Sequence, residues 1–580
     1  MTQLIWKLKP LPEQDKVHQL SKALKTDRDF PLSLANILVQ RGIETYESAR
    51  AFFVPQLSEL HDPFLMKDMD KAIAKLIDVY QTQSSILLFG DYDVDGTSAV
   101  SLLTLALEEL GFRVEYYIPD RYKEGYGLSY QGVDHAAKKG IDLMICLDCG
   151  IKAVEKVRYA QTKGIEVIIC DHHNPGAILP DACAILDPKR PDCSYPFKEL
   201  TGCGVGVKLL VALVQKMKEQ GLPLPSQDYD PLARYVDLLT LSIACDIVPI
   251  TGENRAMAFF GLKKLRTRPI PGIQSLLNQA KEERKWNISD LVFFVGPRIN
   301  SAGRLHHARG AVEVLLGKHE ALIELAQRLH QSNEDRKNLD KSMTQSAMGL
   351  IASDPTFRTK SSTVLFDPAW HKGVIGIVAS RLIESHFRPT VLLTQSEGKL
   401  VGSARSVPGF DLYRALDACS EHLLQWGGHK YAAGLSMNRD QLEEFQLKFD
   451  QVVASSITPE QQTPVIAIDQ ELHLKEIDER FVKTLDRMEP FGPGNRKPVF
   501  MSKGVRITSH RILKQDHVKF WANQDGFQVE CIGFNLAQKW QQLSGDLYDI
   551  AYQPTLNTWN NRTTINLRLK DIQLSHANIS

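Results

Sequence analysis

The chain has 580 residues, and its 69 Lys and Arg residues are balanced by 69 Asp and Glu residues, so the formal net charge is zero. This balance excludes a globally basic nucleic-acid binder, and any site for a polyanion must therefore be a local patch. No apolar run approaches the roughly 20 residues that span a bilayer and no signal-peptide pattern is present, so we expect no membrane association, and the nine scattered cysteines favour a reducing cytoplasm.

Strand and helix patterns alternate in the first third of the chain. Residues 1–80 are expected to be mostly helical, and SSILLFG at 84–90 is a short apolar run that ends in glycine, as a buried strand does. TSAVSLLTLALEELGF at 97–112 then has helical periodicity and begins with Thr97 and Ser98. The alternation continues with strand patterns at 114–119 and 141–150, a helix over 151–163, and a strand pattern at 165–173. This βαβ repetition predicts a parallel sheet covered by helices.

The rest of the chain predicts three further regions. Helical periodicity from about 311 to 352 indicates a long connecting helical region, and a second α/β segment runs from about 361 to 455. Short strand patterns follow from residue 464, which favours a small barrel or sandwich, with 452–463 as the best linker candidate. The predicted fold class is therefore α/β, with domains at 1–310, 311–355, 356–455 and 462–576.

Acidic and histidine residues occur where three of the predicted strands end. DYDVD follows the first strand, Asp148 follows LMICL, and DHH at 171–173 follows EVIIC. Ligands of open parallel sheets lie at the carboxyl ends of the strands, so this topology brings these residues side by side. An isolated Asp at a strand end is usually a cap or turn residue, but this combination in one βαβ series indicates metal binding.

Crowded carboxylates repel one another unless divalent cations lie among them. Carboxylate and imidazole ligands together suit Mn²⁺ or Mg²⁺. Two such cations about 4 Å apart would activate water and stabilise the attacking and leaving oxygens of a phosphoryl transfer. Asp171 is suited to orient a histidine from behind. The candidate metal ligands are Asp91, Asp93, Asp95, Asp148, His172, His173 and, at the end of an apolar stretch, Asp246.

Ordered motifs along the whole chain resemble those of a known family. DYDVDGTSA, LDCG, DHHNP and SIACDIVP are similar to the motifs of the DHH phosphoesterase superfamily. PDRYKEGYGLS, GPRINSAGR, WHKGVIGIVASRL, GSARS and GGHKYAAG resemble the RecJ-type single-strand-specific 5′ DNA exonucleases, and MEPFGPGNRKPVF resembles the start of their C-terminal OB-fold. The resemblance implies a parallel-sheet DHH domain, a long connecting helix, a second α/β domain of the DHHA1 type, and a C-terminal OB-fold β-barrel.

The resemblance also implies roles for the acidic and histidine residues. Asp93 and Asp95 would bind metal, and Asp148 would bridge two ions. His172 and Asp246 would complete the shell. His173 would face the scissile phosphate, and Asp91 would support the site from behind. The implied catalytic residues are Asp93, Asp95, Asp148, His172, His173 and Asp246.

A second set of residues matches positions that bind the substrate in this family. Arg121, Ser403 and Arg405 correspond to a pocket for a 5′ phosphate, and arginine offers a rigid fork for that anion. Further groove contacts are expected from Arg298, Asn300 and Arg304.

The GGH motif at 427–429 resembles the substrate-binding motif of the second domain. His429 would contact phosphate there, and the two glycines would let the backbone approach closely. Tyr126 is either a stacking platform for a base or a core residue.

The C-terminal region favours DNA modestly. From Lys503 onward there are nine Lys and Arg residues and six Asp and Glu residues. OB-folds bind single strands by stacking and phosphate contacts, although aromatic residues in short strands more often belong to the core. The aromatic residues among these bases are Phe520, Trp521, Phe527 and Trp559.

The function that the resemblance implies is a cytoplasmic, single-stranded-DNA-specific 5′→3′ exonuclease. It would release 5′ mononucleotides by two-metal hydrolysis during recombination and repair, together with single-stranded DNA-binding protein and a RecQ-type helicase. One alternative is a DHH phosphodiesterase for short RNA or cyclic dinucleotides, which usually lacks the C-terminal barrel. Another is a non-catalytic DNA-binding scaffold with a degenerate core, which would have lost metal ligands.

Overall fold

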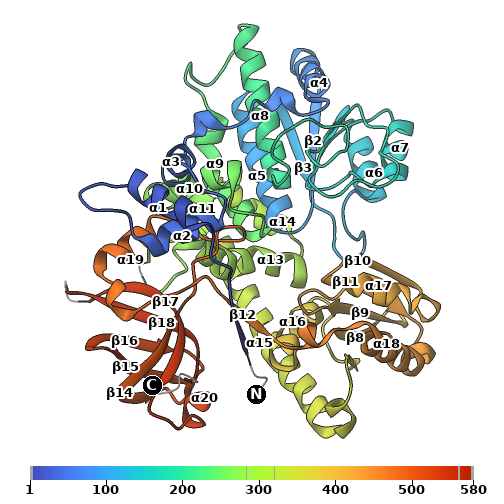
Figure 1. Cartoon of the computed structure of the whole chain (residues 1–580). Coiled ribbons are helices and arrows are strands. Elements are labelled where there is room, and N and C mark those ends of the chain that lie inside the picture. Colours follow the sequence, from blue (N-terminus) through green and yellow to red (C-terminus); the bar gives the residue numbers. More distant parts are fainter. Residues whose placement is uncertain (1–3, 283, 319, 560–561, 576–580) are drawn as a thin grey trace.

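The computed structural model describes residues 4–282, 284–318, 320–559 and 562–575. Figure 1 shows a parallel-sheet domain above, a second sheet domain at the lower right and a β-barrel at the lower left, with a long helix between the last two. Within the described ranges, no helix combines the length and the apolar character needed to cross a membrane.

The first domain is built on five parallel strands in the order β3-β2-β4-β5-β6. Residues Ile86 and Leu88 of β2 belong to the core on one face, whereas Leu87 and Phe89 belong to the core on the other. Burial on both faces explains why this strand reads as a continuous apolar run. The strands are β2 (Ser85–Gly90), β3 (Arg113–Tyr117), β4 (Leu143–Leu147), β5 (Glu166–Cys170) and β6 (Ala184–Leu186). Their helices are α5 (Val94–Glu109), α6 (Tyr130–Lys138), α7 (Val154–Thr162), α8 (Gly202–Glu219), α9 (Pro231–Cys245) and α10 (Gly252–Thr267). The predicted parallel sheet is confirmed.

Helix α5 begins three residues earlier than the pattern predicts. The sequence favours a start at Thr97, but the side chain of Asp93 accepts a hydrogen bond from the backbone N–H of Gly96 at 3.1 Å and caps the helix. Asp95 therefore lies in the first helical turn and not in a loop. This difference matters because it fixes the direction of both carboxylates.

Short helices and one long helix connect the first domain to the second. They are α11 (Pro271–Leu277), α12 (Ile288–Asp290), the π-helical turn η3 (Leu291–Val295), α13 (Gly296–Leu305), α14 (Arg309–Leu316) and α15 (Leu322–Ser353). With 32 residues, α15 is a rod of about 48 Å. It is the long connecting helix that the sequence predicts.

The second domain has a mixed sheet in the order β10-β11-β9-β8-β7, in which only the β7–β8 pair is parallel. Its strands are β7 (Thr363–Phe366), β8 (Thr390–Ser396), β9 (Lys399–Arg405), β10 (Gln425–His429) and β11 (Ala432–Met437). Its helices are α16 (Ile375–His386), α17 (Leu412–Asp417) and α18 (Leu442–Ser456).

The C-terminal domain is a closed barrel, because β14, which pairs with β13 and β15, also pairs with β17 from the other end of the sheet. Phe520 is in its core, whereas Trp521 and Phe527 are exposed; the side chain of Trp559 lies outside the described residues. Its elements are β12 (Val465–Ile468), β13 (Gln470–Glu471), α19 (Glu479–Asp486), β14 (Phe500–Leu513), β15 (His517–Gln524), β16 (Phe527–Gly533), α20 (Ala537–Gln541), β17 (Tyr548–Trp559) and β18 (Arg562–Leu574).

The N-terminal elements pack on this barrel. They are β1 (Ile5–Leu8), α1 (Gln14–Ala23), α2 (Leu32–Gln40) and α3 (Tyr46–Phe53), followed by α4 (Met69–Thr82), which packs on the first sheet. Strand β1 pairs in parallel with β12, and α1–α3 share one hydrophobic core with the barrel. The domain boundaries expected from the sequence remain a prediction. The shared hydrophobic core joins residues 17–52 to residues 472–572, although the expected first domain, 1–310, groups residues 17–52 with the parallel-sheet domain.

Candidate metal centre and adjoining groove

The turn from β2 to α5 positions three carboxylates at the carboxyl end of the sheet. A Cβ atom on Gly90 would lie 2.3 Å from Val100 Cγ2, and one on Gly96 would lie 2.4 Å from the carbonyl oxygen of Asp91. Only glycine therefore permits the strand and helix to cross so closely. The tight crossing directs Asp91, Asp93 and Asp95 toward the ends of the neighbouring strands.

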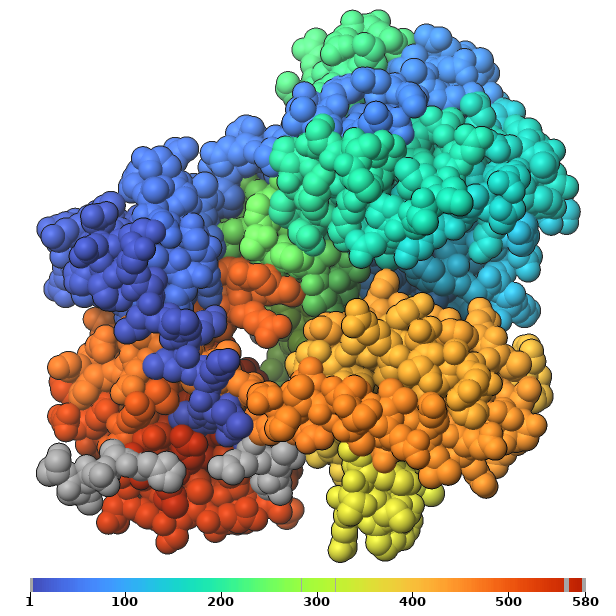
Figure 2. All heavy atoms as spheres, turned by 45° about the vertical axis from the view of Figure 1, so that its right-hand side comes forward, coloured from blue at the N-terminus to red at the C-terminus, as the bar shows by residue number. Residues whose placement is uncertain are grey.

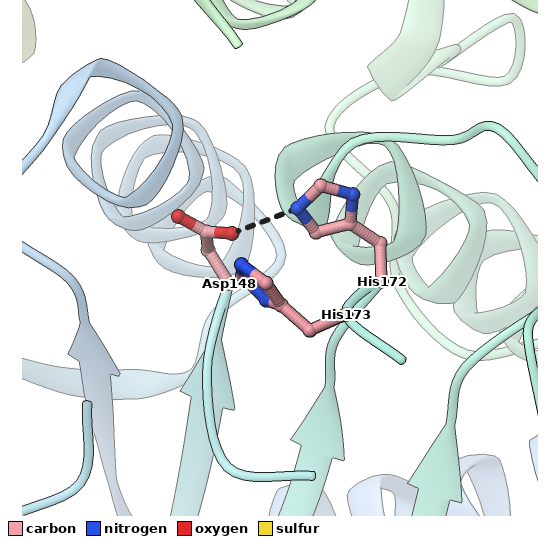
Figure 3. A group of neighbouring side chains, drawn as sticks. All are labelled: Asp148, His172 and His173. Atoms are coloured by element: carbon pink, nitrogen blue, oxygen red, sulfur yellow. Dashed lines mark ion pairs between the residues drawn. The ribbon is translucent and has the colours of Figure 1, made fainter. Parts of the chain in front are cut away.

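The next two strands bring the remaining ligand candidates to the same edge. Asp148 follows β4 in a left-handed conformation (φ 61°), and its N–H donates to the carbonyl of Cys170 at 2.9 Å. His172 and His173 follow β5. Figure 3 shows the contact between His172 and Asp148. The Nε2 atom of His172 lies 3.2 Å from Asp148 Oδ1. The same atom lies 3.7 Å from Asp246 Oδ2 and 3.8 Å from Asp95 Oδ2. Three carboxylates from three different elements thus converge on one imidazole nitrogen.

Hydrogen bonds hold Asp95 in place. Its carboxylate accepts from the backbone N–H groups of Gly202 at 2.7 Å and Cys203 at 3.0 Å, at the start of α8, and from the hydroxyl of Ser242 at 2.7 Å. Unpaired N–H groups at a helix N-terminus stabilise a negative charge. No sequence pattern singled out Ser242, although it lies on α9 four residues before Asp246, the C-cap of that helix, and so shares its helix face.

Asp171 orients His173 from behind. The Asp171 carboxylate lies 2.7 Å from Nδ1 of His173 and also accepts from the backbone N–H of Ile151 at 2.9 Å. Burial alone would raise the pKa of Asp171, but these bonds and the histidine charge outweigh it and hold the pKa at about 2. The same contact raises the pKa of His173 against the effect of burial. Its Nε2 atom lies 3.0 Å from the hydroxyl of Tyr126.

The protein compensates the negative charges of this cluster only in part. Burial, followed by the charge of Asp95, raises the pKa of Asp148, of Asp93 and of Asp246, the last to about 8. Burial and the charge of Asp93 likewise raise the pKa of Asp91. Burial lowers the pKa of His172, so that its ring is neutral and able to act as a ligand.

Unpaired buried atoms indicate what the cluster holds. Among the described residues, both carboxylate oxygens of Asp91 and both ring nitrogens of His172 are buried without a hydrogen-bond partner. Potential ligand atoms lie within 4.8 Å of one another in three overlapping groups: Asp148, His172 and His173; Asp95, His172 and Asp246; and Asp91, Asp93 and Asp148. Asp148 belongs to two of these groups and His172 to two, so the groups adjoin and fit more than one divalent cation. The carboxylate and imidazole donors suit Mn²⁺ or Mg²⁺.

A groove of about 630 Å³ extends from this cluster to the second domain. Asp93, His173 and Tyr126 line one side, and the GGH motif at the end of β10 lines the other. Gly428 has a φ of 147°, and a Cβ atom there would lie 2.3 Å from the carbonyl oxygen of Ala432, so the position requires glycine. His429 lines the groove together with Lys152 of the first domain. Burial and the charge of Lys152 lower the pKa of His429. The ring of Tyr126 is 52% exposed, which favours the stacking platform over the core residue.

A group of cationic side chains lies beside the acidic cluster. We call Arg121, Arg304, Ser403 and Arg405 the arginine pocket. Arg121 stacks on Tyr92, 4.8 Å from the ring centroid, and Nη1 of Arg405 donates to the hydroxyl of Ser403 at 2.9 Å. Burial and the charges of Arg121 and Arg405 lower the pKa of Arg304 to about 10. None of the three guanidinium groups forms an ion pair with a carboxylate of the described chain, so the pocket is suited to an anion.

Two of the predicted groove residues lie elsewhere. Arg298 is buried, its guanidinium lies 3.6 Å from the ring centroid of Phe294, and its Nη2 is 3.0 Å from Nδ1 of His330. These contacts hold Arg298 inside the connecting helices, and Arg298 does not line the 630 Å³ groove, so a groove contact for it remains a prediction. Asn300 is half-buried on α13 and does not line the 630 Å³ groove.

Comparisons with known proteins give a consistent result. Family models match residues 85–243 (DHH family, N-terminal domain), 359–455 (DHHA1 domain) and 468–571 (RecJ OB domain). The single-stranded-DNA-specific exonuclease RecJ of Bacillus subtilis is 34% identical over 571 residues, which cover 97% of this chain and 70% of the relative. RecJ of Haemophilus influenzae is 33% identical over 534 residues, which cover 89% of this chain and 92% of the relative.

Solved structures agree with the sequence relatives. The crystal structure of Thermus thermophilus RecJ in complex with Mn²⁺ matches with a TM-score of 0.83 and 28% identity, over 99% of this chain and 80% of that chain. The same protein in complex with Mg²⁺ matches with a TM-score of 0.75 and 26% identity, over 99% of this chain and 79% of that chain.

Proposed function

The chain belongs to the RecJ family of single-stranded-DNA-specific exonucleases, and from this premise we propose that it degrades single-stranded DNA from the 5′ end and releases 5′ mononucleotides. The proposed 5′→3′ polarity rests on one observation, that the arginine pocket lies directly beside the acidic cluster. Arg121 stacks on Tyr92, the residue between Asp91 and Asp93. A terminal phosphate in the pocket would therefore place the first internucleotide bond near the cluster.

The ligands of two cations, Mn²⁺ or Mg²⁺, are Asp93, Asp95, Asp148, His172 and Asp246 in this proposal, with Asp91 supporting them and His173 close by. When bound, the cations lower the pKa of water and neutralise charge that develops on the phosphate. The hydrogen bonds to Asp95 fix the direction of one ligand before any cation arrives. Such preformed ligands reduce the reorganisation needed in each turnover.

Side chains of the protein hold the substrate around this centre. Arg405 and Arg121 offer paired N–H donors to the terminal 5′ phosphate, with Ser403 as a hydroxyl donor. His173, whose pKa is raised by Asp171, donates to the scissile phosphate from one side of the groove. His429 contacts that phosphate from the other side, and the exposed ring of Tyr126 stacks on a base.

Further parts of the proposal concern the surroundings of the reaction. The exposed Trp521 and Phe527 suit the barrel for holding the single strand beyond the active site. We also propose a cytoplasmic role in recombination and repair, in which a RecQ-type helicase and single-stranded DNA-binding protein supply the strand.

A digestion with Mn²⁺ tests the function directly. The substrates are a long single strand labelled at the 5′ end, the same strand labelled at the 3′ end, and a blunt duplex. Early release of labelled mononucleotide from the 5′ end alone, with the duplex intact and no release by Asp148→Ala, is the expected result. Release only from 3′ ends, or only from short oligonucleotides, would contradict the proposal and favour another branch of the superfamily.

A further inference from the structure

The side chain of Phe293 is unusually exposed. It is 80% exposed, the highest value among the large hydrophobic residues that the structure describes. Single exposed apolar residues are common, so exposure alone requires no explanation. Phe293 is informative because the helical turn that carries it packs against Cys245, the residue before the candidate ligand Asp246.

Phe293 does not belong to a loose loop. It lies in the π-helical turn η3, whose residues Leu291 and Val295 are buried, while Phe294 packs against Trp286 with 5.5 Å between ring centroids. The segment on both sides is thus held in the core, and only Phe293 is turned outward. Single π-helical turns are rare and occur frequently at functional sites.

The turn packs tightly against the end of α9, which carries Asp246. The thiol of Cys245 donates to the carbonyl of Leu291 at 3.6 Å. A Cβ atom on Gly296 would lie 2.6 Å from Cys245 Sγ, so the two segments approach as closely as glycine allows. The element that presents Phe293 is therefore fixed to the residue next to a candidate metal ligand.

A second exposed apolar residue follows that ligand directly. Ile247 is 61% exposed and has a φ of 61°. A β-branched residue in this left-handed region is a genuine conformational outlier, and such strain is found at functional sites. The strained turn keeps an apolar side chain at the surface immediately beside Asp246.

We propose that Ile247 and Phe293 form an apolar step that receives unpaired nucleobases on the far side of the metal centre from the arginine pocket. This inference rests on the proposed exonuclease function and adds a specificity element to it. The step would favour single strands, because a base can lie on an apolar surface only when it is not stacked and paired in a duplex.

The geometry of α13 supports a nucleic-acid occupant. This ten-residue helix, about 15 Å long, begins at Gly296 next to η3 and carries Arg304 of the arginine pocket near its other end. A strand whose 5′ phosphate occupies the pocket would pass the metal centre before it reached the step. Figure 2 shows a small opening between the barrel and the second domain, bordered by blue N-terminal residues and orange residues with green residues behind them, and we take this opening as one exit for the strand.

Abasic substrates test the step. The substrates are 5′-phosphorylated single strands, either intact or lacking one base at position 2, 3, 4, 5 or 6. Full-length protein digests each strand with Mn²⁺, and the single-turnover rate and the affinity are measured for each. Phe293→Ala is expected to weaken binding of the intact strand by about 5-fold or more, in the range of one lost base–aromatic contact. Phe293→Trp should retain binding, and Ile247→Ala should show a smaller loss than Phe293→Ala.

The decisive result is non-additivity. One abasic position should slow the wild type, and the same position should slow Phe293→Ala no further. Leu447→Ala, which removes a 66% exposed apolar side chain from α18, is the matched control and should behave as the wild type.

Two outcomes would overturn the inference: Phe293→Ala indistinguishable from Leu447→Ala, or abasic effects that add to those of Phe293→Ala at every position. A wild type that degrades no single-stranded DNA would instead reject the proposed function itself.

Discussion

Three carboxylates lie within 3.8 Å of one imidazole nitrogen in this protein. Burial and the charges of neighbouring carboxylates raise the pKa of four acidic residues in the cluster, Asp91, Asp93, Asp148 and Asp246. Such an arrangement is unfavourable in the absence of cations, because desolvation penalises each negative charge. Residues with strongly perturbed pKa values in a cleft are candidates for function. The same physics makes the arginine pocket suited to an anion, since the charges of Arg121 and Arg405 act on Arg304 without a carboxylate to balance them.

The arginine pocket leads to a prediction about the 5′ end. Arg405→Ala should slow digestion of 5′-phosphorylated single strands by about tenfold or more, because charge-assisted hydrogen bonds to the phosphate are lost. The loss should be much smaller on a 5′-hydroxyl strand. Rates on both substrates measure the effect, with Arg414→Ala, an 88% exposed side chain of the same domain, as the control. An equal loss of rate on both substrates would show that Arg405 does not bind the terminal 5′ phosphate.

The acidic cluster leads to a prediction about pH. Asp246 keeps its proton up to about pH 8 in the folded, metal-free protein but loses it near pH 4 when unfolded, so stability falls as pH rises between these values. A cation must displace that proton, and affinity should therefore rise with pH by up to about tenfold per unit for each proton released.

Thermal shifts at pH 6 and pH 8, with chelator and with Mn²⁺, measure this linkage. The Mn²⁺-induced rise in Tm should be larger at pH 8, and Asp246→Asn should reduce the difference. A rise that is equal at both pH values in the wild type would refute the assignment.

At the scale of single elements, helix ends determine where the site residues lie. Helix α5 begins at Val94 because Asp93 caps it, and α8 begins where its free N–H groups meet Asp95. Buried polar contacts hold α8 to α10. The carboxylate of Glu253 on α10 accepts from Lys208 of α8 at 2.7 Å and from the hydroxyl of Tyr195 at 2.6 Å.

Glu253→Ala should destabilise the protein by about 3–5 kcal/mol, because the buried ammonium group of Lys208 then loses its carboxylate and keeps only the carbonyl of His61. Urea unfolding measures the change. Glu219→Ala, which breaks an exposed pair with Lys216, is the matched control and should change stability by less than about 1 kcal/mol. A Glu253→Ala protein as stable as the control would mean that Lys208 finds another partner or loses its proton.

At the scale of the whole molecule, the two ends of the chain form one unit. Strand β1 pairs with β12, and the buried side chains of Leu34, Ile37 and Leu38 on α2 belong to the barrel core. The hydrophobic effect therefore couples segments more than 400 residues apart. We therefore expect that removal of the barrel would destabilise the N-terminal helices.

Truncation tests this coupling. A chain that ends at residue 460 should aggregate or lose stability, because it exposes the apolar faces of α1–α3. A chain of residues 61–460, which lacks both partners, should stay dispersed and keep metal-dependent cleavage while binding DNA more weakly. Light scattering and Mn²⁺-dependent digestion measure the two properties. Equal behaviour of the two truncated chains would argue against a shared core.

The sequence by itself determined the βαβ core, the long connecting helix, the second α/β domain and the β-rich C-terminal region. These follow from periodicities of 2 and 3.6 residues, which are local properties. It also determined the ligand candidates, because parallel strands place their carboxyl ends at one edge. The resemblance of the ordered motifs then supplied the family.

Only the tertiary structure decided which side chains meet. It placed Arg298 against Phe294 and His330 and away from the groove, assigned Ser242 to Asp95, and joined α1–α3 to the barrel. It also left Phe293 exposed, on a turn that packs against Cys245, while Phe294, its neighbour in sequence, packs against Trp286. These outcomes depend on packing between segments far apart in the chain, and no local pattern of residues specifies such contacts.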